Sequence, residues 1–291
     1  MRLSILIPTC NTKCLSLVEE LQRQLPDDCE IIVADDGSTD TAAKAKNREM
    51  AGWKGVTYKE GEKNLGRARI RNWLTQQAQG DYVLFIDSDA VVENPHFLTN
   101  YLRCLPTEAV VCGGILHPAT LPSPAQSLRW AYEKHCEPKF TADKRNCHPY
   151  HCLRTFNFMM PRQIALAHPF DEEITRYGYE DTLLGRQLEE DDIEVWHIEN
   201  PLTNGDIETN QVFLQKTEEA MKTLHVIRHK IGRYSQLLVV YRRLQRFHLT
   251  GILRFTYKLT RPLLRRNLLG VHPSVRLFNF YKLGYYACLP N

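Results

Sequence analysis

The chain has 291 residues, of which 43% are hydrophobic and 24% are charged, and its net charge at neutral pH is +3. This composition excludes a disordered, collagen-like or low-complexity chain and indicates a globular protein of one large or two smaller domains. No apolar run approaches the roughly 18–20 residues that a membrane-spanning helix needs. No small-residue cleavage site follows the apolar N-terminus, which predicts a first strand rather than a signal peptide.

The first 116 residues alternate between two patterns. Short apolar runs predict strands, and longer stretches with apolar residues at helical spacing predict helices, one of them opened by the capping residues of "DGSTD". Strands that alternate with helices indicate a mostly parallel, Rossmann-like sheet covered by helices on both faces. The predicted strands span residues 3–8, 30–34, 56–59, 82–86 and 109–116, and the predicted helices span residues 13–25, 39–50, 64–78 and 95–105.

Polar residues follow three of these strands, in "IPTCN", "VADDGSTD" and "FIDSDA". In open α/β sheets, ligands bind beyond the carboxyl ends of the strands. Asp87 and Asp89 are two residues apart, so both can point to one face, and such a pair is costly without a cation. Carboxylate oxygens favour Mg²⁺ or Mn²⁺. The alternative is a capped turn, in which both carboxylates accept from local backbone amides.

A second acidic strand end, at Asp35 and Asp36, favours a ligand over simple turn chemistry. An inward-facing carboxylate can accept the imide N–H of a uracil or the 2′-hydroxyl of a ribose. Neither G-x-G-x-x-G nor G-x-x-x-x-G-K-[ST] follows the first strand, which argues against a dinucleotide-binding dehydrogenase and a phosphate-loop nucleotidase. Acids and a metal without a glycine loop therefore suggest a nucleotide-sugar enzyme.

Five segments, in this order, resemble the motif series of glycosyltransferase family 2, which has the GT-A fold: "SILIPTCN", "IIVADDGSTD", "NLGRARIRN", "DYVLFIDSDA" and "GYEDTLLGRQL". The resemblance covers roughly residues 1–225. It implies transfer of a sugar from a nucleotide diphosphate donor, with a UDP-sugar favoured, to a saccharide or lipid-linked acceptor. It also implies inversion and a place in surface polysaccharide or glycolipid synthesis.

The resemblance predicts a catalytic domain over residues 1–225 and a basic helical region over residues 226–291. The nucleotide-sugar half of the catalytic domain would span about residues 1–116, and the acceptor half about residues 117–225. Two other classes stay open. A sugar-1-phosphate nucleotidyltransferase shares a related sheet, but it would want a glycine-rich basic loop where this chain has "PTCNTKC". The other class is a non-catalytic sugar-binding relative of the family, and the presence of Asp87, Asp89 and Asp181 argues against it.

The resemblance also implies a set of donor-binding residues. The segment that faces the nucleobase comprises Pro8, Thr9 and Asn11. Asp36, with Asp35 beside it, would bind the uracil edge. The basic residues near the diphosphate or ribose are Arg67 and Arg71. Cys10 stands where many members have an aromatic residue, which removes a stacking partner for the base. The alternative for Arg67 is a solvated helix face.

The segment Asp87-Ser88-Asp89 corresponds to the family's D-x-D motif. The resemblance implies that Asp89 ligates Mn²⁺ or Mg²⁺ and that Asp87 contacts the ribose or a metal-bound water, with Ser88 in the same donor site. A cation across both phosphates neutralises charge on the leaving diphosphate. Related enzymes often have a histidine as third ligand, which would be His197, and a neutral imidazole suits Mn²⁺. The alternative is a structural histidine.

The acceptor side is expected in the second half of the chain. In "LRTFNFMMPR", the resemblance makes Asn157 the residue that faces the sugar, the alternative being an ordinary polar residue of an edge strand. In "RYGYEDTLLGRQL", Glu180 and Asp181 precede an apolar-periodic helix, whose N-terminal dipole keeps a carboxylate ionised. By resemblance Asp181 is the general base and Glu180 positions acceptor or donor. The alternative is that both only cap the helix.

The nine cysteines are odd in number and have no export signal beside them, which predicts reduced thiols in the cytoplasm. Six Cys and His side chains gather in one stretch of the chain. Their spacing matches no standard zinc finger or ribbon, so a loop with buried thiols is favoured over a zinc site. They are His135, Cys136, Cys147, His148, His151 and Cys152.

The net charge hides an asymmetry. The last 72 residues, from Ala220, hold 14 Lys or Arg and no Asp or Glu, so the first 219 hold the other 23 basic and all 34 acidic residues, a net charge of −11. A basic amphipathic helix without acids predicts a peripheral binder of an anionic membrane surface. The alternative is a helix packed on the acidic body. Nucleic acid is not expected, because no binding motif accompanies the charge.

Two sets of residues carry the predicted amphipathic pattern. The apolar side is formed by Tyr241, Leu244, Ile252, Phe255 and Leu259, and the basic side by Arg243, Arg246, Arg254, Lys258 and Arg261. Pro262 is expected to break or end the helix.

Overall fold

A computed structural model describes residues 2–290. They form two compact units. The first unit comprises the chain up to Leu116, Lys139–Thr175 and Leu184–Asp206. The second comprises His117–Pro138, Arg176–Leu183 and the chain from Ile207 onward. These units do not follow the predicted boundary at residue 225, because the C-terminal helices share a core with earlier helices.

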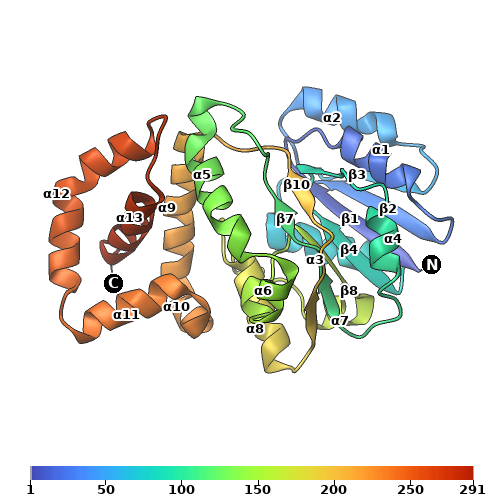
Figure 1. Ribbon diagram of the computed structural model, residues 1–291. Helices are drawn as coiled ribbons and strands as arrows, with labels where there is room; N and C mark the ends of the chain where they lie inside the picture. The colour runs from blue at the N-terminus through green and yellow to red at the C-terminus, as the bar shows by residue number, and fades with distance from the viewer. Residues whose placement is uncertain (1, 291) are drawn as a thin grey trace. The chain divides into compact units, whose positions relative to one another are not determined.

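A seven-stranded sheet lies at the centre of the first unit, among the residues that the structure describes (Figure 1). Its order is β3-β2-β1-β4-β8-β6-β9. The first four strands along this order run parallel, and β8 is antiparallel to both of its neighbours. The mostly parallel sheet is therefore confirmed. The strands are β1 Leu3–Thr9, β2 Cys29–Asp35, β3 Val56–Glu60, β4 Tyr82–Ile86, β6 Val110–Cys112, β8 Asn157–Pro161 and β9 Val195–His197.

Helices cover both faces of this sheet, because successive strand residues point to opposite sides. On one face, α1 (Leu15–Arg23) and α4 (Phe97–Leu102) pack on Ile5, Ile7 and their neighbours. On the other face, α3, α7 and the second half of α8 pack on Leu6, Phe85 and their neighbours. Helix α8 spans Glu180–Glu190 and belongs to this unit from Leu184 onward. The remaining helices in this unit are α2 Thr41–Asn47, α3 Arg67–Gln77, α6 Ala142–Asn146 and α7 Arg162–Ala167.

The strand predicted over residues 109–116 is divided in two. Gly113 and Gly114 separate β6 from β7 (Ile115–Leu116), which joins a small second sheet with β5 (Ala90–Val91) and β10 (Leu202–Asn204). A side-chain carbon at Gly113 would lie 2.5 Å from three polar atoms of neighbouring residues, so only glycine fits this break. The division brings β10 beside the segment that follows β4.

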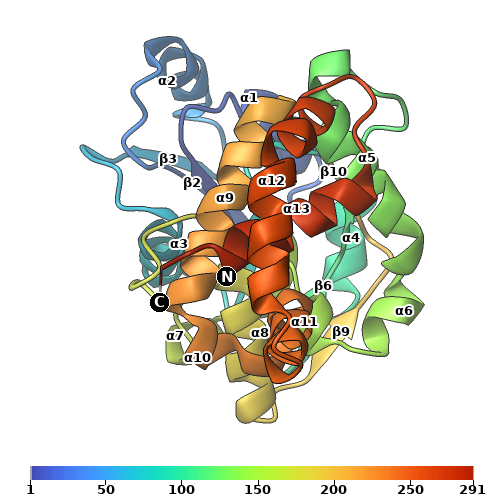
Figure 2. The ribbon, with the colours of Figure 1, turned by 90° about the vertical axis from the view of Figure 1, so that its left-hand side faces the viewer.

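The second unit is helical and has its own core. The core is built by one or more buried residues from each of α5, α9, α12 and α13, and α12 packs on α13 (Figure 2). Within residues 2–290, no helix combines the length and the hydropathy that a membrane span requires. The helices are α5 Ser127–Cys136, α9 Asn210–Val226, α10 Arg228–Ile231, α11 Gln236–Arg246, α12 Thr250–Leu268 and α13 Val275–Ala287.

The expectation that Pro262 ends a helix is wrong. Pro262 lies inside α12, which continues to Leu268. A proline removes one backbone hydrogen bond of a helix. Pro262 is exposed, so water can take the place of the missing amide, and the helix tolerates it.

Candidate functional site

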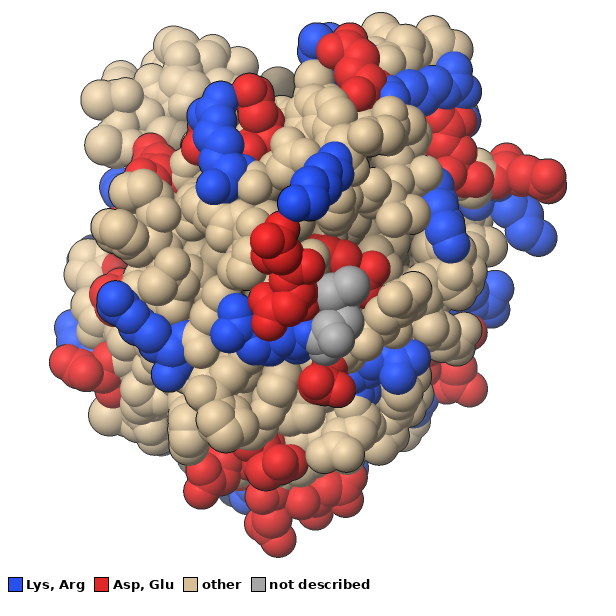
Figure 3. Space-filling model, turned by 90° about the vertical axis from the view of Figure 1, so that its right-hand side faces the viewer, with Lys and Arg blue, Asp and Glu red and all other residues tan. Residues whose placement is uncertain are grey.

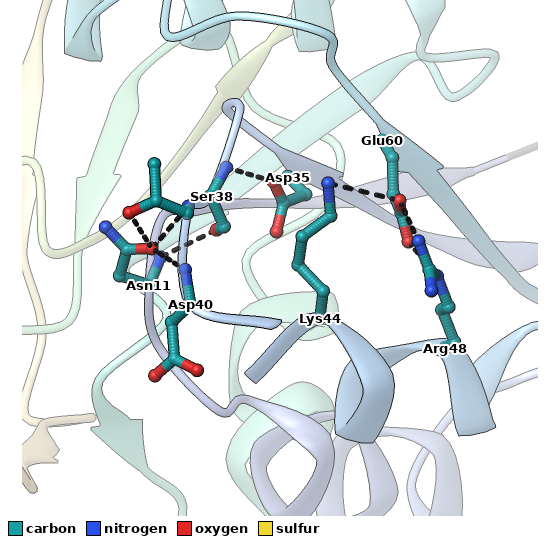
Figure 4. Close-up of polar contacts among 8 residues, drawn as sticks. Asn11, Asp35, Ser38, Asp40, Lys44, Arg48 and Glu60 are labelled. Carbon is teal, nitrogen blue, oxygen red and sulfur yellow. Dashed lines mark hydrogen bonds and ion pairs between the residues drawn. The ribbon is translucent and has the colours of Figure 1, made fainter. Parts of the chain in front are cut away.

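The loops after β1 and β2 are tied together by Asn11 (Figure 4). Its φ of 55° lies in the left-handed region, which asparagine tolerates better than most residues. The Asn11 Oδ1 accepts from the backbone N of Thr39 and of Asp40, both at 2.8 Å. Its own backbone N donates to the Ser38 Oγ at 2.7 Å. The side-chain oxygen of Asn11 therefore fixes the "DGSTD" loop, and its place at the nucleobase stays a prediction.

The two acids after β2 have different surroundings. Both carboxylate oxygens of Asp36 accept from the loop before α3, at 2.6 Å from the Leu65 N and 3.0 Å from the Gly66 N. Asp35 accepts from the Ser38 N at 2.7 Å through Oδ1, while its buried Oδ2 has no hydrogen-bond partner within residues 2–290. Buried acceptors are nearly always paired. We therefore transfer the base-binding hypothesis from Asp36 to Asp35.

The end of β1 supplies the remaining residues predicted at the base. Pro8 and Thr9 are the last residues of the strand, and the buried Thr9 donates its hydroxyl to the Thr12 O at 3.1 Å. Cys10 is exposed, and its Sγ accepts from the Asn64 Nδ2 at 3.3 Å. The thiol thus lies at the surface, beside the loop that Asp36 holds.

Arg71 and Asp87, both predicted in the donor site, are brought together. The Arg71 Nη2 donates to the Asp87 Oδ1 at 2.6 Å, a charge-assisted bond. Arg71 is 2% exposed and its guanidinium lies 5.4 Å from the centre of the Phe170 ring. Its Nε and Nη1 have no hydrogen-bond partner in the described part of the chain. Arg71 therefore fixes Asp87 in one orientation. Arg67, the first residue of α3, is exposed.

Asp87, Ser88 and Asp89 form the turn between β4 and β5. The Ala90 N donates to the Asp87 O at 3.1 Å, and the Gly205 N donates to the Asp89 O at 2.8 Å. Asp89 is thereby fixed at the backbone to the end of β10, where Asn204 pairs with Ala90. The sequence patterns did not predict this neighbour. Its only signal is the turn-forming "TNGD", which follows Pro201 and Leu202.

His197 does not lie with the aspartates, so its assignment as a third metal ligand is corrected. One row of paired residues crosses the sheet from His197 in β9 to Phe85 in β4. It runs through Cys112 in β6 and Phe158 in β8. Three strand spacings, about 14 Å, therefore separate His197 from Phe85, two residues before Asp87. Both ring nitrogens are also engaged, Nδ1 at 2.9 Å from the Arg145 Nη1 and Nε2 at 2.9 Å from the Pro149 O.

The buried ring of His197 predicts a pH-dependent stability. Burial lowers the pKa of His197 from 6.5 to about 4, with the Arg145 guanidinium acting in the same direction. As the pH falls from 6.5 to 4, the unfolded chain therefore takes up a proton that the folded chain does not. The free energy of unfolding should fall by about 3 kcal/mol across this window. Urea titrations at several pH values measure it.

The matched variants for this measurement are His197→Gln and His96→Gln. The former removes the buried titrating group, and the pH dependence between 6.5 and 4 should flatten. The latter removes an exposed histidine and should leave the slope unchanged. Equal slopes in the parent and His197→Gln would show that this imidazole does not titrate as described.

Asn157 is not available to an acceptor sugar, so this assignment is corrected as well. It is 1% exposed, and its Oδ1 accepts from the Tyr101 hydroxyl at 2.7 Å. Its Nδ2 donates to the Gly114 O at 3.1 Å and to the Asn200 O at 2.9 Å. All these partners are protein groups, so the amide holds the break between β6 and β7 against β8.

Glu180 and Asp181 form the first turn of α8, as predicted. The chain enters this turn through two left-handed residues, Gly178 (φ 101°) and Tyr179 (φ 73°). The Asp181 Oδ1 accepts from the Thr182 N at 2.7 Å. Glu180 is 9% exposed. The helix start is confirmed, and the role of Asp181 as general base stays a prediction.

The donor set at the D-x-D turn fits a hard divalent cation. Among residues 2–290, no group of three or more His, Cys, Asp or Glu side chains is placed to hold a metal, and this includes the Cys and His residues between 135 and 152. Asp87 and Asp89 supply carboxylate oxygens. Mg²⁺ typically takes one or two carboxylates and completes its shell with water and substrate phosphates. Two acids would therefore suffice, with water and substrate phosphates as the other ligands.

The sheet, the acidic strand ends and the flanking helices define an α/β fold of the GT-A type. The chain belongs to glycosyltransferase family 2, since residues 4–165 match the family model described as glycosyl transferase family 2. A curated relative, glycosyltransferase GlyG of Streptococcus pneumoniae, is 30% identical over 114 residues, 38% of each chain. The matched segment thus spans less than half of that relative.

Two solved structures are similar in fold. One is residues 1–349 of TarS from S. aureus, with a TM-score of 0.55 and 18% identity over 79% of this chain and 65% of that one. The other is a mannosyltransferase from Pyrobaculum calidifontis, solved in complex with GDP-Man and Mn²⁺. Its TM-score is 0.56, with 14% identity over 98% of this chain and 84% of that one. At these identities the likeness shows the fold alone.

Proposed function

We propose that the protein is a metal-dependent, inverting glycosyltransferase. It would transfer a hexosyl group from a nucleoside diphosphate sugar, with a UDP-sugar favoured, to a saccharide or lipid-linked acceptor in cell-surface polysaccharide or glycolipid synthesis. The observation that carries the proposal is the ion pair between Arg71 of α3 and Asp87, just after β4. It fixes the first acid of the D-x-D turn in a chain of this family. The unpaired Asp35 Oδ2 supports the uracil preference.

The proposed roles follow from the residues themselves. Asp35 accepts a base N–H, Arg71 orients Asp87, and Asp87 and Asp89 hold the cation. Mn²⁺ or Mg²⁺, when bound, would neutralise charge on the leaving diphosphate. Asp181 takes the proton of the acceptor hydroxyl, and the acceptor oxygen then attacks the anomeric carbon from the face opposite the diphosphate. Glu180 positions the acceptor or the donor sugar.

The two other classes make different predictions. A nucleotidyltransferase would bind a nucleoside triphosphate and a sugar phosphate, and a non-catalytic relative would bind a nucleotide sugar without consuming it.

We place the enzyme in the cytoplasm, peripheral to the inner face of the membrane, where its C-terminal region would meet a lipid-linked acceptor.

A thermal-shift screen of nucleotide sugars with Mn²⁺ tests the proposal. A ligand that binds only the folded state stabilises it by about 2.7 kcal/mol at 100 times its Kd, which raises Tm by several degrees in a chain of this size. UDP-sugars should give the largest shift. A larger shift with GDP-sugars would correct the base preference, and no shift with any nucleotide sugar would contradict the proposed function.

Two variants make this screen specific. Asp35→Asn removes the acceptor oxygen and should reduce the shift with UDP-sugars. Asp28→Asn, an exposed acid just before the same strand, should leave it unchanged. Equal shifts in both variants would remove Asp35 from the base site.

A further inference from the structure

Helix α12 is apolar on two opposite faces. One face is buried in the core of the second unit through Leu253, Tyr257, Leu264 and Leu268. The opposite face is exposed, with Ile252 at 64%, Phe255 at 70%, Leu259 at 68% and Leu263 at 67%. These four residues recur every three or four positions, so they form one stripe along the helix. An amphipathic surface helix normally has one apolar face, and the second one needs an explanation.

The stripe continues into the turn between α11 and α12. Phe247 is 64% exposed and Leu249 is 40% exposed. We call these six residues the apolar ridge: Phe247, Leu249, Ile252, Phe255, Leu259 and Leu263. From Ile252 to Leu263 the ridge is about 16 Å long at the rise of an α-helix. Contiguous exposed apolar surfaces of this kind mark interaction sites.

The helices that carry the ridge are basic, and their own sequence contains no acid. The exposed basic residues of α11 and α12 are Arg242, Arg243, Arg246, Lys258, Arg261 and Arg266. No Asp or Glu occurs from Ala220 to the end of the chain. The face of the molecule in Figure 3 differs, since acidic and basic side chains lie interspersed on it. Glu218 of α9 pairs with Arg265 of α12, but the six exposed basic residues of α11 and α12 have no acid on their own helices. A row of apolar side chains on such basic helices complements a surface that is apolar inside and anionic outside.

We propose that the apolar ridge docks on an anionic lipid membrane, with α12 lying in the plane of the headgroups. Interfacial helices bury their apolar face about 5–10 Å deep, which the length of Phe and Leu side chains can reach. The flanking Arg and Lys would meet lipid phosphates. The inference deepens the proposed function and rests on it only for the reason to dock, which is access to a lipid-linked acceptor.

Charge argues against the other occupants. A second copy of this chain on the ridge would set two basic surfaces against each other, and like charges across an interface are unfavourable. Nucleic acid would use the positive charge but not the row of Phe, Leu and Ile side chains. A membrane surface uses both features.

The structure also changes how docking must be tested. Tyr241 and Leu244, predicted on the apolar side, are half-buried, so they are not part of the ridge. Deleting the chain from Arg242 onward would take Tyr257, Leu268 and Tyr281 out of the core. Exposed ridge residues must be replaced in the full chain instead.

Co-sedimentation with vesicles of phosphatidylcholine and phosphatidylglycerol tests the inference. The full chain should bind these vesicles at about 0.1 M salt and release them near 1 M, where the Debye length falls from about 10 Å to about 3 Å. It should bind pure phosphatidylcholine much more weakly. The double variant Phe255→Gln, Leu259→Gln should bind anionic vesicles at least roughly tenfold more weakly, because each side chain buries a large apolar area.

The matched control is Val226→Gln. Val226 is 63% exposed in the same unit but lies outside the ridge, so its replacement should leave binding unchanged. Thermal unfolding should be the same in all variants. No binding by the parent at low salt would overturn the inference. Unchanged vesicle binding by the double variant would overturn it as well. If the double variant also differed from the parent in oligomeric state, the ridge would be a self-association surface. The nucleotide-sugar screen is independent of vesicles, so failure of one proposal is distinguishable from failure of the other.

Discussion

Replacing Asp181 with asparagine is expected to lower turnover by roughly 10²–10⁴-fold, the usual contribution of a positioned general base. Asparagine keeps the shape of the side chain and an oxygen that can accept from the Thr182 N, the contact that Asp181 makes at 2.7 Å. Asparagine is also a good residue at a helix N-terminus, so α8 should still begin at the same place. Only the capacity to take a proton is lost.

Donor binding and turnover, measured together, distinguish three roles of Asp181: general base, donor-binding residue and helix cap. If it is the base, the Asp181→Asn variant should keep the thermal shift with nucleotide sugar and lose turnover. The control is Glu190→Gln, which removes a carboxylate from the last turn of the same helix, where Glu190 pairs with Arg186, and should retain activity. A variant that loses donor binding and turnover together would make Asp181 a binding residue. Unchanged turnover would reduce it to a helix cap.

The strands could be predicted because their signal is local. Buried runs such as residues 82–86 are strands of the expected length, and the polar residues after parallel strands meet at one edge whatever the details of packing. Asn157 and His197 could not be judged in this way. Their roles depend on hydrogen bonds to Tyr101, Gly114, Arg145 and Pro149, far away in the sequence. A motif predicts residue types, but it does not reveal which polar groups already have partners.

Helix α12 illustrates the same limit for hydrophobic patterns. Periodicity revealed an apolar stripe through Ile252, Phe255 and Leu259, but the protein core covers another one, through Leu253, Tyr257 and Leu264. Both recur at helical spacing, and the choice is made by distant partners such as Phe278 and Tyr281. The stripe found from the sequence is therefore the exposed one. The structure adds that this stripe is exposed and that a second, buried stripe of the same helix does the packing.

Asp89→Ala is expected to abolish metal-dependent transfer, a loss of at least 10²–10³-fold by analogy with removal of other charge-stabilising groups. Asp89 lies in the turn after β4, and its backbone is fixed by Gly205 and by the pairing of Ala90 with Asn204. These contacts use the main chain, so the fold should survive the substitution. Asp87 would remain with Arg71, but one carboxylate paired with a guanidinium holds a divalent cation poorly, since the guanidinium already balances its charge and engages its Oδ1.

Two measurements make this result specific to the metal. In the parent, Mn²⁺ should increase the thermal shift produced by UDP, because a cation held by Asp87 and Asp89 would attract the diphosphate. In Asp89→Ala, the shift with UDP should become independent of Mn²⁺. The control is Asp81→Ala, which removes an exposed acid just before the first residue of β4. Its shift with UDP should depend on Mn²⁺ as in the parent. Activity that survives both the Asp89→Ala substitution and a chelator would mean that these acids serve the turn alone, and that charge on the leaving diphosphate is neutralised by basic side chains such as Arg71.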